Sequence, residues 1–149
     1  HPYLKNQRAI GKEITGDRRF LGRIKMDTKG NAIFPHYDEE GTCGYEIKNK
    51  GFTGFSAGGD KGLWVSRCFA GDESLVIAES AIDALSFHAL HKWKTARYVS
   101  TAGGWSPQTR TLLSGCEKVI LSMYSESKDW NEDLKGSVSP SLLPDKHEP

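Results

Sequence analysis

The middle of the chain changes from one hydrophobic pattern to another within two residues. Leu75–Ala78 is a run of four apolar residues that follows the turn-forming stretch Gly71–Ser74. Such a run predicts a strand buried on both faces, as in a parallel sheet. Small and apolar residues then recur at helical spacing, at Ala81, Ala84, Leu85, His88 and Ala89. We therefore expect an amphipathic helix immediately after the strand.

The junction between these two elements carries candidate chemistry. Ser80 and Asp83 have the spacing of a capping box, in which both side chains satisfy free amide groups of the first helical turn. Glu79 stands at the carboxyl end of the predicted strand, where open α/β sheets hold their ligands. It is a candidate for metal binding or proton transfer. The alternative is that Glu79 only places negative charge at the helix N-terminus.

Strand and helix signals alternate again farther along the chain. Thr95–Ser100 predicts a second parallel strand, and Gly103 and Gly104 after it permit a close approach of the backbone to a ligand. A helix should begin at Ser106-Pro107 and end at Gly115. Lys118–Met123 predicts a third buried strand. The order β-α-β-α-β predicts a parallel sheet with right-handed crossovers.

The N-terminal half has a different pattern. Tyr3–Ile14 predicts a short helix that ends near Gly11 or Gly16. Alternating residues and turn clusters between Arg19 and Lys50 predict an antiparallel meander, which begins with a strand over Phe20–Met26. Pro35 cannot donate to a ladder, so its strand should be an edge or carry a bulge there.

A glycine-rich stretch follows the meander, from Gly51 to Gly62. Its backbone amides could cradle phosphates, with bases stacked on Phe52 or Phe55. We favour a tight connection whose aromatic side chains fill the core, because no phosphate-loop spacing is present. Leu63–Ser66 predicts a further strand.

Composition narrows the class of protein. The chain has 149 residues, of which 37% are hydrophobic and 26% charged, as expected for one compact globular domain. It contains no apolar run long enough to span a membrane and no secretory signal, so no membrane partner is expected. Cys43, Cys68 and Cys116 suggest neither a disulfide framework nor a zinc site, which fits a reducing cytoplasm. The opening at His1, without an initiator methionine, suggests a piece of a longer protein.

The net charge of +1 argues against coating of nucleic acid by bulk electrostatics. Charge is uneven, however, because residues 1–30 hold eight Lys or Arg against three Asp or Glu. Such a basic end could meet phosphates, although a solvated mixed surface is the commoner explanation. His88 and His91 lack a third ligand at metal-site spacing, and no serine or cysteine has a histidine partner for triad catalysis. We expect His36 to be structural and the four tryptophans to anchor cores.

These residues resemble a known family. Leu75–Ser86 is similar to the first motif of the Toprim fold, in which a hydrophobic strand is followed by Glu, usually Gly, two residues and Asp. Here these are Glu79, Ser80 and Asp83, with serine in place of the usual glycine. Further segments resemble primase-related Toprim proteins of plasmids and other mobile elements, namely Ala32–Asp38, Gly44–Asn49, Gly51–Phe55, Lys61–Trp64, Arg97–Thr101 and Lys128–Asn131.

The resemblance implies an α/β fold, with a parallel Toprim sheet covered by helices on both faces and preceded by a β-rich antiparallel extension. We place the extension and the N-terminal helix in residues 1–70 and the Toprim domain in 71–149. Toprim proteins carry an Asp-x-Asp pair after the third strand, but here Met123 is followed by Tyr124-Ser125-Glu126-Ser127. Either a segment was omitted between 123 and 124 or the protein lacks it, and we favour the first.

The resemblance also implies Mg²⁺- or Mn²⁺-dependent phosphoryl or nucleotidyl transfer on nucleic acid, with DNA and nucleotides as partners beside other replication or transfer proteins. Glu79 would be a metal ligand or a general acid/base and Asp83 a supporting carboxylate and metal ligand. Gly103 and Gly104 would lie beside a phosphate, and Lys48, Lys50 and Lys61 would contact the nucleic-acid backbone. Primer synthesis is the favoured activity. A noncatalytic DNA-binding accessory module and a Toprim nuclease are the alternatives.

Overall fold

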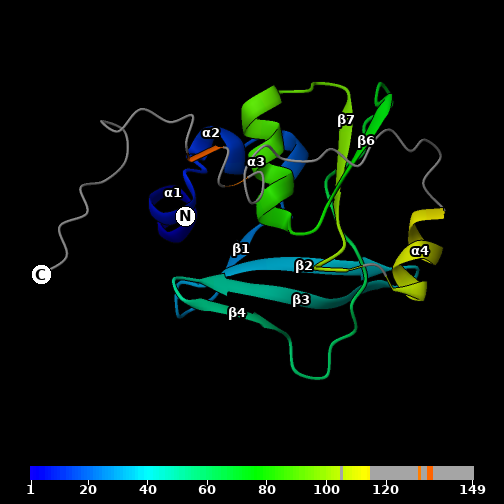
Figure 1. The fold of residues 1–149 in the computed structure, drawn as a ribbon, viewed down its shortest axis with the longest axis horizontal. Coiled ribbons are helices and arrows are strands. Elements are labelled where there is room, and N and C mark those ends of the chain that lie inside the picture. Colours follow the sequence, from blue (N-terminus) through cyan, green and yellow to red (C-terminus); the bar gives the residue numbers. More distant parts are fainter. Residues whose placement is uncertain (105, 115–130, 132–133, 136–149) are drawn as a thin grey trace, which may run out of the picture.

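The computed structural model describes residues 1–104, 106–114, 131, 134 and 135. Within them the chain forms a mixed α/β fold with two sheets (Figure 1). The elements in chain order are α1 (Pro2–Arg8), α2 (Lys12–Thr15), the 3₁₀ helix η1 (Arg18–Phe20), β1 (Lys25–Met26), β2 (Ala32–Asp38), β3 (Gly41–Asn49), β4 (Phe52–Phe55), β5 (Trp64–Val65), β6 (Ser74–Ala78), α3 (Ala81–His91), β7 (Ala96–Ser100) and α4 (Pro107–Ser114).

The N-terminal helix is divided in two. Ala9 adopts a left-handed conformation with φ of 57°, and the amide of Ile10 donates to the carbonyl of Leu4 at 3.0 Å. These features end α1 after Arg8, so α2 begins separately at Lys12 behind the cap residue Gly11. The single helix predicted over Tyr3–Ile14 was therefore wrong in its continuity, because Ala9 takes a backbone conformation that its sequence does not signal.

The predicted strand over Phe20–Met26 was also wrong for most of its length. Asp17 accepts a hydrogen bond from the amide of Arg19 at 2.8 Å and so caps η1. Gly22 has a φ of 77° and turns the chain, which leaves only Lys25–Met26 as β1. Phe20 is buried and stacks on Trp64, with ring centroids 6.0 Å apart. The apolar residue that suggested strand alternation thus packs in the core.

The antiparallel meander was predicted correctly. β1, β2, β3 and β4 pair in that order, and all pairs are antiparallel. β1 reaches only Ala32 and Ile33 of β2, so Pro35 needs no partner on that side, and the register shifts between His36 and Tyr37. The glycine-rich stretch is not only a connection, because its first part forms β4.

The second sheet has the order β5-β7-β6. β6 and β7 are parallel, as predicted, with Val76 opposite Tyr98, and α3 connects them. β5 is antiparallel to β7, so the described sheet is mixed and the wholly parallel sheet of the prediction is not shown. The predicted strand over 118–123 and the junction of 123 with 124 lie outside the described residues.

One core cluster contains residues from both halves of the chain. Leu4, Phe34, Trp64, Leu85 and Tyr98 are among its fully buried members. Trp64 donates from its indole nitrogen to the carbonyl of Arg23 at 2.7 Å, so its polar atom is also satisfied. Trp93 packs against the same cluster, whereas Trp105 and Trp130 lie outside the described residues. The division of the chain at residue 70 stays a prediction.

The two sheets are also joined through their backbones. The amide of Tyr37 in β2 donates to the carbonyl of Leu63 at 2.8 Å, and the amide of Leu63 donates back at 2.9 Å. This antiparallel bridge lies immediately before β5. In the part of the chain that the structure describes, no helix has the length and apolar character needed to cross a membrane.

Candidate functional site

A cleft of about 460 Å³ lies where the four-stranded sheet faces the carboxyl ends of β6 and β7. One wall comes from β3, β4 and Lys61, and the other from the β6–α3 junction and the turn after β7. The residues that line it are Arg8, Glu46, Lys48, Thr53, Gly54, Phe55, Lys61, Glu79, Ser80, Ile82, Asp83, Ala102, Gly103 and Asn131. Five of the seven site residues predicted from the sequence are among them.

Glu79 follows the last residue of β6 and precedes the cap of α3. Its backbone carbonyl accepts a hydrogen bond from the amide of Gly103 at 2.8 Å, which joins the ends of the two parallel strands. The side chain is exposed to solvent and has no hydrogen-bond or ion-pair partner within the described residues. Its carboxylate is therefore available to a ligand in the cleft.

Ser80 is the N-cap of α3, as predicted, whereas the carboxylate of Asp83 binds the hydroxyl of Ser80. The hydroxyl of Ser80 accepts from the amide of Asp83 at 3.1 Å and donates to its carboxylate at 2.7 Å. These bonds fix the first turn of α3, whose N-terminus faces the cleft. Asp83 lines the cleft, but one of its carboxylate oxygens is engaged by the cap, so its described role is structural.

The turn after β7 is shaped by unusual backbone angles. Ala102 has a φ of 52° and Gly103 a φ of 106°, and the hydroxyl of Thr101 donates to the carbonyl of Gly103 at 2.5 Å. Gly103 lines the cleft, and Gly104 is exposed outside it. The structure thus places only the first of the two predicted glycines at the site.

The three predicted lysines have different positions. Lys48 lines the cleft, and its amine lies 3.4 Å from a carboxylate oxygen of Glu46. The amine of Lys61 donates to the carbonyl of Ala102 at 3.4 Å, so Lys61 crosses from one wall towards the other. Lys50 is exposed in the turn between β3 and β4 and does not line the cleft.

A buried polar pair beneath Lys48 was missed by the sequence reasoning. His36 is fully buried between the carbonyl of Gly62 and the carboxylate of Glu46, each 3.0 Å from a ring nitrogen. Because a carbonyl can only accept, the nitrogen facing Gly62 carries a proton. His36 is structural, as expected, and holds Glu46 in place. The alternation along β3 puts Glu46 and Lys48 on one face, but their partners depend on the strand register.

Arg8 and Asn131 were also missed. Asn131 is buried and donates to the carbonyl of Arg8 at 2.8 Å and to the hydroxyl of Ser86 at 3.0 Å. A side-chain nitrogen of Arg8 donates to the amide oxygen of Asn131 at 3.3 Å. Asn131 thus links α1 to α3 beside the cleft. Arg8 and Asn131 are 123 positions apart in sequence, so no local pattern could have predicted their contact.

The described residues do not form a complete metal site. Among residues 1–104, 106–114, 131, 134 and 135, no three His, Cys, Asp or Glu side chains converge on one point. His88 and His91 do not form a ligand pair, because His88 contacts Asp17 and Tyr98, whereas the ring of His91 lies 4.4 Å from that of Phe87. Glu79 would thus supply only one oxygen ligand from the described part of the chain.

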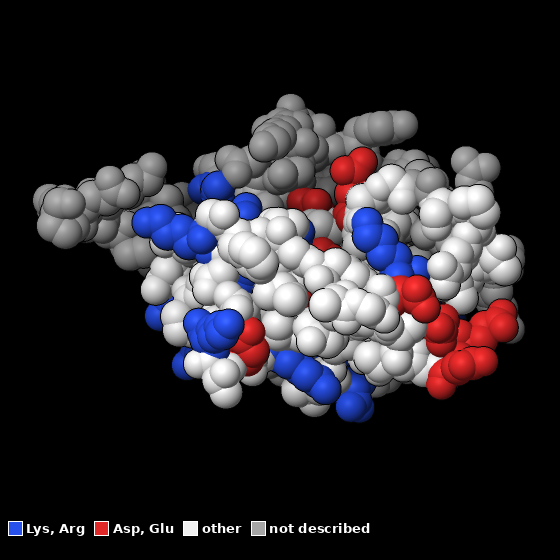
Figure 2. All heavy atoms as spheres, turned by 90° about the horizontal axis from the view of Figure 1, so that it is seen from below, with Lys and Arg blue, Asp and Glu red and all other residues white. Residues whose placement is uncertain are grey.

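Basic side chains do not gather into one patch on the face of the described residues that Figure 2 shows. Figure 2 shows the face seen from below, with Lys and Arg side chains spread over it and Asp and Glu gathered mainly at one side. That side corresponds to the end of the sheet where β2 and β3 are joined by the acidic turn Asp38–Glu40.

Comparisons with known proteins agree with the described architecture. Residues 2–73 match a family described as "Protein of unknown function (DUF3991)". No curated protein matches the sequence significantly. Among solved structures, the chain is similar to the primase fragment of the bacteriophage T7 primase-helicase protein. The likeness has a TM-score of 0.52 and 18% identity, over 87% of this chain and 68% of that chain. This chain shares a fold with a primase fragment.

Proposed function

We propose that this chain is part of a primase-like protein that transfers nucleotides on DNA, with the cleft as its site. The proposal depends mainly on Glu79, whose exposed carboxylate lines the cleft. The backbone carbonyl of Glu79 is bonded to the amide of Gly103, and Lys61 lies on the opposite wall. Phosphates suit such a place, because lysine amines can bind their oxygens. The likeness to a primase fragment supports the fold on which this proposal rests.

The resemblance to Toprim proteins belongs to this proposal, as do an origin in a plasmid or other mobile element, a cytoplasmic location and association with replication or transfer proteins. Mg²⁺ or Mn²⁺ is also part of it. Such hard cations prefer oxygen ligands and neutralise phosphate charge during transfer. Glu79 would supply one ligand, and the predicted position of further acidic ligands lies outside the described residues.

The test compares the wild type with Glu79→Gln, which keeps the shape of the side chain and removes its charge. We expect Mg²⁺-dependent nucleotide incorporation to fall by about 10²-fold or more, because an acid/base or charge-stabilising group is lost. Glu73→Gln is the matched control, since Glu73 is an exposed carboxylate just before β6, at the opposite end of the same strand. Equal incorporation by both variants would exclude a catalytic role for Glu79.

A nicking assay and a DNA-binding titration separate the alternatives. Nicking that is lost in Glu79→Gln, without incorporation by the wild type, would favour a nuclease at the same cleft. Binding of single-stranded DNA by the wild type, with neither activity, would favour the noncatalytic accessory module. DNA binding itself should change little in Glu79→Gln, because phosphate contacts from basic side chains dominate such affinity.

A further inference from the structure

A second groove lies on another part of the molecule and shares no lining residue with the cleft. Its volume is about 410 Å³, and it is lined by Leu21, Gly22, Arg23, Arg67, Cys68 and Phe69. Two segments form it, the turn after η1 and the loop after β5. The amide of Arg67 donates to the carbonyl of Arg19 at 2.7 Å, which holds these segments side by side.

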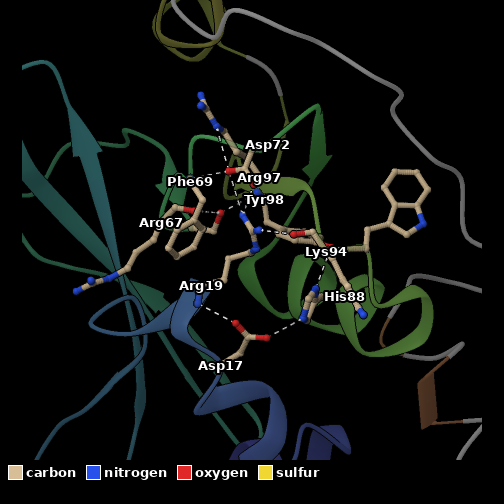
Figure 3. Close-up of polar contacts among 11 residues, drawn as sticks. Asp17, Arg19, Arg67, Phe69, Asp72, His88, Lys94, Arg97 and Tyr98 are labelled. Atoms are coloured by element: carbon tan, nitrogen blue, oxygen red, sulfur yellow. Dashed lines mark hydrogen bonds and ion pairs between the residues drawn. The ribbon is translucent and has the colours of Figure 1, made fainter.

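The groove is positively charged. Its two charged lining residues, Arg23 and Arg67, are both arginines, and no carboxylate lines it. Arg67 is exposed, and its Nε donates to the carbonyl of Leu21 at 2.9 Å. Figure 3 shows its side chain extending away from Arg19 and Asp72. This bond orients the guanidinium while leaving its terminal nitrogens without an acceptor among the described residues.

Arg23 is held by a different contact. Its guanidinium carbon lies 4.6 Å from the centre of the Tyr37 ring, so the side chain is stacked in one orientation. Its Nε is buried and has no hydrogen-bond partner within the described part of the chain. Because Nε is covered, a ligand in the groove would meet the terminal nitrogens of this guanidinium, which have no acceptor among the described residues.

Asp72, whose carboxylate contacts the backbone of Phe69, does not neutralise the groove. Asp72 accepts from the amide of Phe69 at 2.8 Å, and its oxygens bind Arg19 and Arg97. Its charge is therefore already matched within the protein. Phe69 has the guanidinium of Arg18 over its ring at 4.3 Å, which adds a third arginine at the border of the groove.

We propose that this groove binds a phosphodiester group of a nucleic-acid strand, at a site separate from the cleft. Two oriented guanidinium groups match the oxygens of a phosphate, which arginine binds in a bidentate manner. The apolar surface of Leu21, which is 47% exposed, offers contact for a sugar or base. The groove thus extends the binding surface beyond the site of the proposed transfer, and it does not depend on that activity.

Cys68 provides a direct test, because its thiol is exposed and lies in the groove. The wild-type chain is treated with a maleimide, and modification of each cysteine is followed by peptide mass spectrometry with and without a single-stranded oligothymidylate. We expect the oligonucleotide to slow labelling of Cys68 several-fold at low salt, with the protection lost at high salt as counterions compete. Cys43, which is half-buried and lines neither groove nor cleft, serves as the internal reference.

Two other probes test the chemistry of the ligand. Inorganic phosphate and an oligo-glutamate peptide, each matched to the oligonucleotide in charge concentration, should protect Cys68 far less. Equal protection by either probe would overturn the assignment to a nucleic-acid strand. Unchanged labelling of Cys68 at an oligonucleotide concentration that saturates binding would overturn the site itself.

Variants locate the charges that matter. Arg23→Gln combined with Arg67→Gln should abolish the protection and reduce the salt dependence of binding by a logarithmic slope of about 0.7, the contribution of one neutralised phosphate on a single strand. Lys29→Gln is the control, because Lys29 is exposed in a turn and lines neither site. Glu79→Gln should keep the protection, so a chain without transferase activity can still pass this test.

Discussion

Arg19 and Asp72 form an ion pair in the interior in which one guanidinium nitrogen contacts both carboxylate oxygens, although the two residues are 53 positions apart in sequence. The Nη1 of Arg19 lies 2.9 and 3.1 Å from the two carboxylate oxygens, and the side chains are only 6% and 2% exposed. The Nη2 of Arg19 donates to the carbonyl of Lys94 at 2.7 Å (Figure 3). The pair therefore joins η1 to the segments that precede β6 and β7.

Breaking this pair should strongly destabilise the protein. Arg19→Met removes the main cationic partner of the buried Asp72 carboxylate and leaves its negative charge poorly paired. We expect the free energy of unfolding to fall by about 3 kcal/mol. Urea unfolding followed by circular dichroism measures the change. Arg18→Met is the comparison variant, because Arg18 is exposed and contacts only the ring of Phe69 among the interactions described. The loss should stay at about 0.5–1 kcal/mol, as expected for an exposed cation–π contact.

The same ion pair should make the free energy of unfolding depend on pH in the acid range. Burial alone would raise the pKa of Asp72, but the amide of Phe69 and the guanidinium of Arg19 outweigh it and hold the pKa below its ordinary value of 3.8. The unfolded chain therefore binds a proton first as the pH falls below about 4, and the stability contributed by Asp72 is lost there. Asp72→Asn should flatten unfolding free energy against pH in this range. An unchanged slope would contradict the assignment.

His88 should also make the protein less stable as the pH falls, but in a range above that in which Asp72 acts. Burial lowers its pKa below the ordinary value of 6.5, and the carboxylate of Asp17 opposes this without overcoming it. Burial also raises the pKa of Tyr98, so that its hydroxyl stays protonated and can donate to the Nδ1 of His88, 2.9 Å away. In the neutral ring Nε2 then donates to Asp17, while the cations of Arg19 and Lys92 also disfavour protonation.

Because the unfolded chain protonates this histidine near pH 6.5, the free energy of unfolding should decrease as the pH falls through 6.5 and level off below the folded pKa. Denaturant titrations between pH 7.5 and 5 measure the slope. His88→Gln should remove it, and the exposed His91→Gln should leave it in place. A slope that persists in His88→Gln would assign the effect to another group.

Loss of the cap at Ser80 should weaken α3 at the cleft. Ser80→Ala removes the acceptor for the amide of Asp83 and the donor to its carboxylate, and we expect a loss of about 1 kcal/mol in unfolding free energy. Ser80→Thr keeps the hydroxyl and should recover most of it. Thermal unfolding of the three proteins checks the order, and equal stability of the alanine and threonine variants would show that the cap contributes nothing.

Replacing Gly103 should strain the turn after β7. Its φ of 106° is rarely adopted by residues with a side chain, although an added Cβ would meet no atom within 4 Å. Gly103→Ala should therefore cost about 1–3 kcal/mol through backbone conformation alone. Gly71→Ala is the control, since that glycine has equal space and no positive φ. Chemical denaturation measures the free energy of unfolding of both variants. A larger loss in Gly103→Ala than in Gly71→Ala would show that backbone strain, and not crowding by the new methyl group, is the cause.

Local signals were sufficient for the β6–α3 junction. A short apolar run, a cap residue and a change of period all lie within Leu75–His91, and the structure has the expected strand, cap and helix. Phe20 shows the limit of this reasoning. It satisfied the alternation of a strand, but it is the last residue of a 3₁₀ helix and packs against Trp64 in the core. Alternation describes exposure and does not distinguish a strand from a turn that buries one residue.

The polar networks needed information that the sequence does not contain. Glu46 faces His36 only because β2 and β3 pair in one register with a shift after His36. Arg19 and Asp72 meet only after η1 and the loop before β6 have packed together. Neither residue belongs to a motif, and their separation in sequence does not indicate that they meet. Glu79 and Gly103 were predictable because parallel strands bring their carboxyl ends to one edge.

The backbone bridge between Tyr37 and Leu63 limits how the walls of the cleft can move. Its reciprocal hydrogen bonds couple the two sheets, so a motion that separated the sheets at this point would have to break both bonds. A ligand would thus enter a preformed space and spend little of its binding energy on closing the protein. Slow exchange of these two amide hydrogens, unchanged by nucleotide, is the behaviour expected of such a rigid frame.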